Sequence, residues 1–195
     1  MLSTKISNIA LSLTLAIDAK AKKRKAAGQN VLLFSAGEPD AIPPKHILTA
    51  VHEAINQPLN AHYSPTGGLE KLKHAIAEKC ERENNIFAKD SEIIVTNGAK
   101  EALFLFFAAV INPGDEVIIP VPAWVSFEEQ IRFFGGIPIY VPTDNTFHFT
   151  IEDMERAVTP RTKVLMLNSP VNPTGAIVPQ ETMEKIANLV QKNHF

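Results

Sequence analysis

Short apolar runs alternate with helical segments through the second half of this 195-residue chain, and this alternation is the strongest constraint on its fold. The apolar runs cover residues 93–95, 116–121, 137–141 and 163–167, and segments of helical spacing cover residues 101–110, 126–134, 151–157 and 180–192. The runs lack the polar alternation of a strand that has one face in water. Buried strands joined by helices predict an α/β fold with a mostly parallel sheet that is covered on both faces.

Helical spacing dominates the first part of the chain. Helices are expected over residues 6–27, 44–57 and 69–83. The second of these has one apolar face, made by Ile47, Leu48, Val51 and Ile55. The change of rhythm near residue 45 or 90 is the best indication of a domain boundary in the sequence.

The composition is that of an ordinary globular protein, with 45% hydrophobic and 21% charged residues. A net charge of −2 argues against a nucleic-acid partner held by bulk electrostatics. The apolar run from Ala102 to Ile111 is too short for a membrane span, which takes about 20 residues. The single Cys80 has no partner for an internal disulfide and no neighbouring metal ligand, which fits a reducing, cytoplasmic compartment. The basic residues between Lys20 and Lys25 fit either the solvated face of a helix or a site for an anion.

An anion-binding turn is one interpretation of residues 95–102, VTNGAKEA. An apolar run enters a glycine turn there and a helix starts at once, so that free backbone N–H groups meet the positive end of the helix dipole. The small residues Gly98 and Ala99 would let a phosphate approach the backbone. The motif differs from the glycine-rich loops typical of ATP and NAD sites. A plain strand-to-helix turn is the alternative.

Two further loops follow predicted strands, where ligands bind in parallel α/β sheets. In residues 168–175, NSPVNPTG, two prolines stiffen the loop, and Asn172 precedes one of them, which holds its amide in place to donate and accept. Trp124 follows the strand at 116–121 and offers a flat face for an aromatic ring. The alternatives are a proline–glycine turn and a core tryptophan.

Together these segments resemble the class I aminotransferases, which are pyridoxal-phosphate (PLP) enzymes of fold type I. The resemblance rests on residues 35–40 (SAGEPD), 63–68 (YSPTGG), 95–100 (VTNGAK), 113–117 (PGDEV), Trp124 and 168–175 (NSPVNPTG), in the order and spacing of the family. The Asn-Pro-Thr-Gly element is quite specific to this fold type. The whole set is similar to the bacterial aspartate aminotransferase branch, some members of which accept prephenate.

The resemblance implies pyridoxal 5'-phosphate as the cofactor and gives a role to each matched residue. The backbone N–H groups of Gly98, Ala99 and Lys100 would hold its phosphate. Trp124 would stack on its pyridine ring, and Asn172 would bond the ring hydroxyl oxygen. Trp124 and Asn172 would also line the substrate site. No metal is implied.

The remaining matched residues concern the substrate and a second subunit. Gly37 matches the glycine whose N–H meets the substrate α-carboxylate. Ser12, Thr14 and Lys100 fall where this branch recognises an acidic side chain. Tyr63 matches a tyrosine that reaches the phosphate in the neighbouring subunit, which implies a homodimer with shared sites. From the residues alone, Tyr63 also fits a loop tyrosine packed on its own helix, and Lys100 fits a solvated lysine.

The resemblance makes residues 1–45 an N-terminal arm with part of the small domain, and residues 46–195 the first part of the PLP-binding large domain, an α/β/α sandwich. Family members continue further. The Schiff-base lysine, the acid paired with the pyridinium nitrogen and the carboxylate-binding arginine are therefore expected beyond Phe195. The chain would carry no catalytic residue and would be inactive alone. Lys163, Lys185 and Lys192 are the amines nearest its end, at a strand start and on a surface helix.

The implied reaction is transfer of the amino group of aspartate, or another acidic amino acid, to 2-oxoglutarate. Within the same fold type, an aromatic or prephenate aminotransferase and a carbon–sulfur lyase are alternatives. A truncated, non-catalytic binding or dimerisation module is an alternative of another class. Small amino acids and 2-oxo acids are the expected partners, without nucleic acid or membrane.

Overall fold

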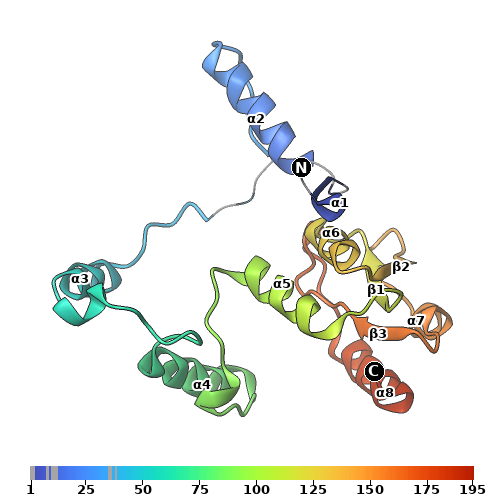
Figure 1. Cartoon of the computed structure of the whole chain (residues 1–195). Helices are drawn as coiled ribbons and strands as arrows, with labels where there is room; N and C mark the ends of the chain where they lie inside the picture. Colours follow the sequence, from blue (N-terminus) through green and yellow to red (C-terminus); the bar gives the residue numbers. More distant parts are fainter. Residues whose placement is uncertain (1–2, 8, 10–12, 35–36, 38) are drawn as a thin grey trace. The chain divides into compact units, whose positions relative to one another are not determined.

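The computed structural model describes residues 3–195, apart from residues 8, 10–12, 35–36 and 38 (Figure 1). The chain divides into two compact units. The first consists of Met1–Ile9 with Thr96–Phe195, and the second of Ala10–Val95. The predicted boundary near residue 45 lies inside the second unit and stays a prediction.

The described part of the chain contains one sheet, of three parallel strands. The strands are β1 (Glu116–Val121), β2 (Ile137–Pro142) and β3 (Thr162–Leu165), in the order β2-β1-β3. The central strand β1 is buried at each of its first four positions, because it has a neighbour on both edges and helices on both faces. The prediction of an α/β fold with a parallel sheet is confirmed.

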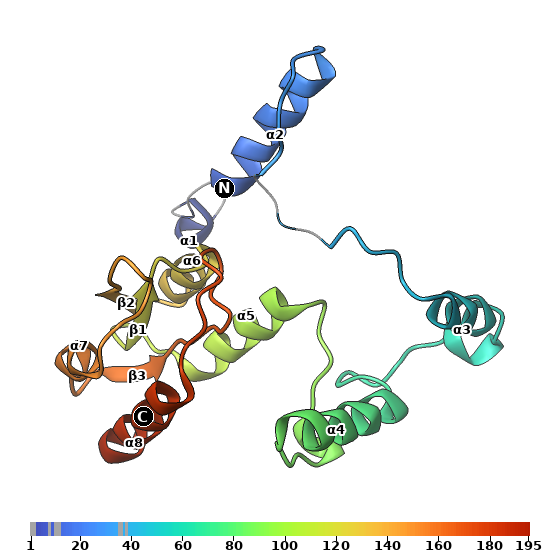
Figure 2. The same ribbon diagram turned by 180° about the vertical axis from the view of Figure 1, so that it is seen from behind.

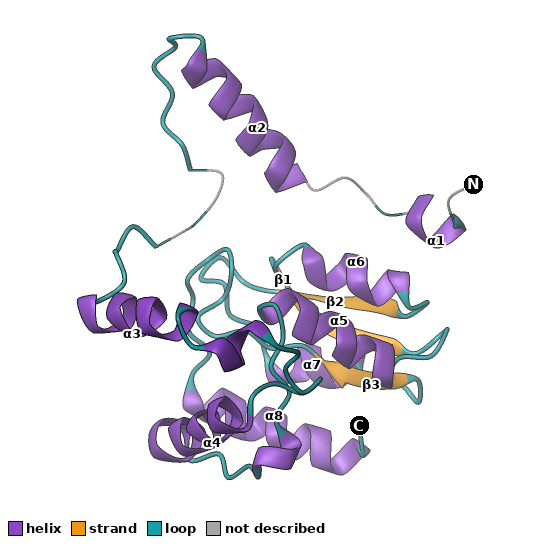
Figure 3. Ribbon diagram, turned by 60° about the vertical axis from the view of Figure 1, so that its left-hand side comes forward, coloured by secondary structure: helices purple, strands orange, loops and turns teal. Residues whose placement is uncertain are grey.

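Helices cover both faces of this sheet, as predicted (Figure 3). They are α5 (Ala99–Val110), α6 (Ser126–Phe133), α7 (Ile151–Ala157) and α8 (Gln180–Asn193). Successive residues of β1 point to opposite faces of the sheet. Val117 and Ile119 pack with Phe107 of α5 and Ile131 of α6, and Ile118 packs with residues of α7 and α8. The short helix α1 (Thr4–Ser7) belongs to the same unit, and the Lys5 ammonium lies 5.5 Å from the centre of the Phe133 ring.

The starting end of the sheet carries a buried charge. The Glu116 side chain, only 3% exposed, accepts hydrogen bonds from the Thr159 hydroxyl at 2.5 Å and from the Arg161 guanidinium at 2.5 and 2.9 Å. The hydroxyl lowers the pKa of Glu116 most; burial raises it and Arg161 lowers it further. This cluster ties the first residue of β1 to the loop that enters β3.

The second unit is helical (Figure 2). Its helices are α2 (Leu13–Ala26), α3 (Lys45–Ile55) and α4 (Glu70–Asn84), with the short 3-10 helices η1 (Pro58–Ala61) and η2 (Asp90–Glu92). The predicted apolar face of α3 is present but open to solvent, since its four residues are 42–74% exposed. The basic residues of α2 are exposed as well, and Lys22 forms an ion pair with Asp18 at 2.8 Å.

Two predictions about the residues before Thr96 are wrong. Residues 93–95 were expected to be a buried strand, but they form no strand and Ile94 is 69% exposed. A strand needs a ladder of partners, and the backbone bond recorded for Val95 goes to the loop residue Gly67, at 2.9 Å. The single helix expected over residues 6–27 is instead two helices, α1 and α2, with Ile9 outside both.

Candidate functional site

The turn before α5 has the geometry of an anion-binding turn. Gly98 has φ 79° and ψ 173°, a conformation open essentially to glycine alone, and it is the residue from which the helix starts. Its N–H donates to the Thr96 carbonyl at 2.8 Å, and the Thr96 hydroxyl donates to the Gly98 carbonyl at 3.1 Å. A Cβ built on Gly98 would meet nothing within 4 Å. The backbone is therefore open to an approaching group.

The first turn of α5 offers N–H donors. The amides of Ala99, Lys100 and Glu101 precede the first helical bond, which runs from the Ala102 N–H to the Gly98 carbonyl at 3.3 Å. No acceptor for these three amides is recorded within the described residues. The Glu101 carboxylate folds back and accepts from the Asn97 N–H at 2.5 Å, which fixes the turn in the manner of a capping box.

Trp124 and Lys100 lie together, although they stand 24 positions apart in the sequence. The Lys100 ammonium lies 5.2 Å from the centre of the Trp124 ring, within the range of a cation–π contact. Trp124 is partly buried against the core and meets Phe127 edge to face, with ring centres 5.5 Å apart. An aromatic face and a cation therefore stand beside the N–H groups of the turn.

Gln130 of α6 completes this arrangement, and no motif in the sequence singled it out. Its side-chain amide nitrogen donates to the Lys100 carbonyl oxygen at 3.0 Å. Its amide oxygen is buried and has no hydrogen-bond partner among the described residues. A long-range bond of this kind leaves no local signal, so only the structure could find it.

The loop of residues 168–178 follows β3 and leads to α8, at the carboxyl end of the parallel sheet. The bonds from Asn172 N–H to Asn168 Oδ1, at 3.1 Å, and from Val178 N–H to Ser169 Oγ, at 3.0 Å, fold it on itself. The Ser169–Pro170 and Asn172–Pro173 peptide bonds are cis. Asn172 is exposed, so its side-chain amide is free to meet a ligand.

A small pocket joins this loop to the Trp124 loop. It is lined by Pro122 and Ala123 from one loop and by Asn168 and Asn172 from the other. Its volume of about 30 Å³ has room for one or two water molecules. The pocket is thus a small gap between the two loops, too small for a cofactor.

The other predicted site residues belong to the second unit. Gly37 is exposed, and Tyr63 is fully exposed in the loop after η1. Thr14 lies in α2, but its side chain is not described, and Ser12 lies outside the described residues. The structure thus brings together Gly98, Ala99, Lys100 and Trp124, with Asn172 on a loop that shares a pocket with the Trp124 loop.

This set of groups fits a phosphorylated aromatic cofactor such as PLP. Unpaired amides at a helix N-terminus suit a phosphate, and the missing Cβ of Gly98 leaves it a path to the backbone. The partly buried Trp124 ring suits a flat heterocycle. In the part of the chain that is described, no cluster of side chains could hold a metal ion, and no helix is long and apolar enough to cross a membrane.

Comparison with known proteins gives a consistent family. A family model described as aminotransferase class I and II matches residues 29–195. A probable aspartate/prephenate aminotransferase of Aquifex aeolicus is 46% identical over 188 residues, which make up 95% of this chain and 48% of that protein. The solved structure of the Thermus thermophilus aspartate aminotransferase with maleate superposes with a TM-score of 0.94 at 41% identity, covering 100% of this chain and 51% of that one. The chain spans about half the length of the Aquifex aeolicus protein and of the aspartate aminotransferase of Bacillus subtilis.

Proposed function

The chain belongs to the class I and II aminotransferases, and from this membership we propose that the whole protein is a PLP-dependent aminotransferase that prefers acidic amino acids. Aspartate would be the amino donor and 2-oxoglutarate the acceptor. The observation that carries the proposal is the Lys100 ammonium over the Trp124 ring, beside the open N–H groups of α5. A cation at this place suits a substrate that brings a second carboxylate.

Each part of the proposed site has one physical task. When bound, PLP supplies an electron sink that stabilises negative charge on the substrate Cα. The amides of the first turn of α5 would hold the phosphate, and the Trp124 face would cover the ring and keep water from it. The Asn172 amide would donate to the ring hydroxyl oxygen. The Lys100 ammonium pairs with the distal carboxylate of the substrate.

Residues of the second unit complete the proposal. Gly37 would offer its N–H to the substrate α-carboxylate, and Ser12 and Thr14 would help to recognise the acidic side chain. The exposed Tyr63 would reach the cofactor phosphate of a second copy of the protein, so the active form would be a homodimer in the cytoplasm. The Schiff-base lysine, the acid that pairs with the pyridinium nitrogen and the carboxylate-binding arginine would lie outside residues 1–195.

Prephenate is a second candidate acceptor, because the names of several relatives include it. The maleate in the superposed structure is a dicarboxylate, and it supports the acidic substrate class more directly. Prephenate also carries two carboxylates, so a cation at Lys100 suits both candidates.

A substrate panel tests the proposal. For the native-length protein, we expect kcat/KM for aspartate to exceed that for phenylalanine. The Lys100→Met variant should lose about 10- to 100-fold in kcat/KM for aspartate, the worth of a hydrogen bond to a charged group. The value for phenylalanine should change little.

The PLP affinity of the same variant serves as the control, since Lys100 also belongs to the phosphate turn. Equal losses of kcat/KM for aspartate and phenylalanine would contradict the role of Lys100 in substrate choice. A native protein that transaminates none of the donors would contradict the proposed function.

A further inference from the structure

Gln130 links the two elements that carry the proposed cofactor contacts. It lies in α6, which begins two residues after Trp124, and its side chain reaches the first turn of α5. The acceptor is the Lys100 carbonyl, in the turn whose amides face the phosphate site. The ammonium of Lys100 in turn lies over the Trp124 ring, just before α6.

The contacts of Gln130 and Lys100 hold the turn before α5 at a set distance from Trp124, and PLP binding requires such a distance. The phosphate and the pyridine ring belong to one rigid molecule, so the turn and the tryptophan must be held at one separation to serve both. Trp124 is itself joined to α6, because its carbonyl accepts the Phe127 N–H at 3.0 Å. A hydrogen bond from α6 to the turn therefore sets the turn relative to the ring that covers the cofactor.

The buried amide oxygen of Gln130 offsets part of the stability that the bond to Lys100 contributes. The oxygen has no partner among the described residues, and a buried acceptor without a partner costs free energy. A methionine has nearly the same length and shape and would bring no such acceptor. The loss of the bond to Lys100 and the removal of the unpaired oxygen would then nearly offset each other in stability.

We infer that Gln130 is a positioning residue for the cofactor, holding the phosphate turn at Gly98–Lys100 in register with Trp124. The inference rests on the proposed function. It assigns Gln130 no contact with PLP or substrate, since its amide acts through the Lys100 carbonyl.

The Gln130→Met variant of the native-length protein separates positioning from stability. We expect the melting temperature of its apoprotein to stay within about 2 °C of the wild type, because the two changes offset each other. The dissociation constant for PLP, measured by equilibrium dialysis, should rise about five- to tenfold, as for one lost hydrogen bond. The circular dichroism of the bound cofactor should fall, since its ring is held less rigidly.

Gln180→Met is the matched control. Gln180 donates to Glu184 on the exposed surface of α8, at 3.0 Å. Loss of this bond should change neither the melting temperature nor the dissociation constant for PLP. Gln130→Leu repeats the test with a smaller side chain should the methionine variant not fold.

The outcomes separate the inference from the proposed function. A wild-type protein that binds no PLP would overturn both. A wild type that binds PLP, with a Gln130→Met variant of equal affinity, would overturn the inference alone. Variants that bind PLP normally once folded but melt much lower, or that do not fold at all, would make Gln130 a structural residue and would also overturn it.

Discussion

At the scale of single residues, the site depends on contacts between groups that the sequence places far apart. The motif around Gly98 and the single Trp124 could both be recognised from the sequence as candidates. Their arrangement could not, because the Lys100 ammonium reaches the Trp124 ring only once α5 and α6 are packed. Gln130 gave no signal, since a glutamine inside an amphipathic helix usually faces solvent.

Gly98 allows a test at this scale. Its φ of 79° and ψ of 173° disfavour any side chain, although a Cβ would meet no atom within 4 Å. We expect Gly98→Ala to lower the free energy of unfolding by about 1–3 kcal/mol through backbone strain alone. It should also weaken PLP binding, because the methyl group occupies the approach to the turn. Urea unfolding and equilibrium dialysis measure the two effects.

Gly37→Ala is the control for backbone strain. Gly37 also has open space around it, but its φ lies outside the positive range, so the variant should keep its stability. Equal losses of unfolding free energy in Gly98→Ala and Gly37→Ala would contradict the explanation by backbone strain at Gly98.

At the scale of elements, the sequence located the first unit well and the second unit less well. The strand β1 and the helix α7 have the predicted bounds, because apolar runs and helical spacing are unambiguous when turns enclose them. The run at 93–95 is also apolar, yet it forms no strand. Strand formation depends on a partner elsewhere in the chain, which a local pattern does not contain.

The cluster of Glu116, Thr159 and Arg161 allows a test at the scale of elements. The Thr159 hydroxyl and then Arg161 lower the pKa of the Glu116 carboxyl below 4.5, against the effect of burial. A lowered pKa in the folded state adds stability that is complete above the unfolded pKa and is lost as the pH falls through the folded pKa. At neutral pH, Glu116→Gln should lower the free energy of unfolding by about 1.5–3 kcal/mol, the range of hydrogen bonds to charged groups.

This difference between wild type and Glu116→Gln should shrink as the pH falls below 4.5. Urea unfolding at pH 7 and at a series of lower values measures it. Glu128→Gln is the control, because Glu128 pairs with Arg132 on the surface at 3.0 Å and contributes little. A difference that stays constant with pH would contradict the role given to the charged form of Glu116.

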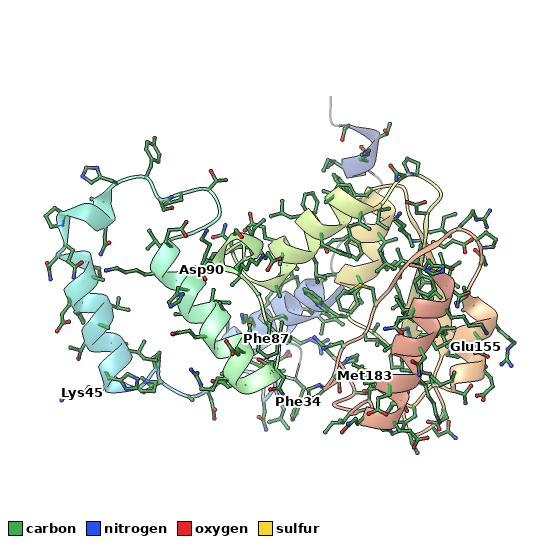
Figure 4. All side chains as sticks on the ribbon, turned by 90° about the horizontal axis from the view of Figure 1, so that it is seen from below. Phe34, Lys45, Phe87, Asp90, Glu155 and Met183 are labelled. Carbon is green, nitrogen blue, oxygen red and sulfur yellow. The ribbon has the colours of Figure 1, made fainter. Side chains whose placement is uncertain are left out.

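At the scale of the whole molecule, the family resemblance drawn from the motifs is confirmed by the matched family model and by the superposed structure. Large apolar side chains are exposed, among them Phe34 and Phe87, labelled in Figure 4, at 90% and 79% exposed. Exposed groups of this kind often mark interaction surfaces. The sequence predicts apolar residues on α3 and α4. It contains no pattern that tells which groups would pack against them.

The central proposal is that residues of this chain would hold PLP while the lysine that bonds it would lie outside residues 1–195. Borohydride reduction of the PLP-loaded native protein, followed by peptide mass mapping, tests this most directly, because reduction makes the lysine–cofactor bond permanent. We predict one labelled lysine outside residues 1–195 and none within them. A label on Lys100, Lys163, Lys185 or Lys192, or no labelled lysine at all, would contradict the account.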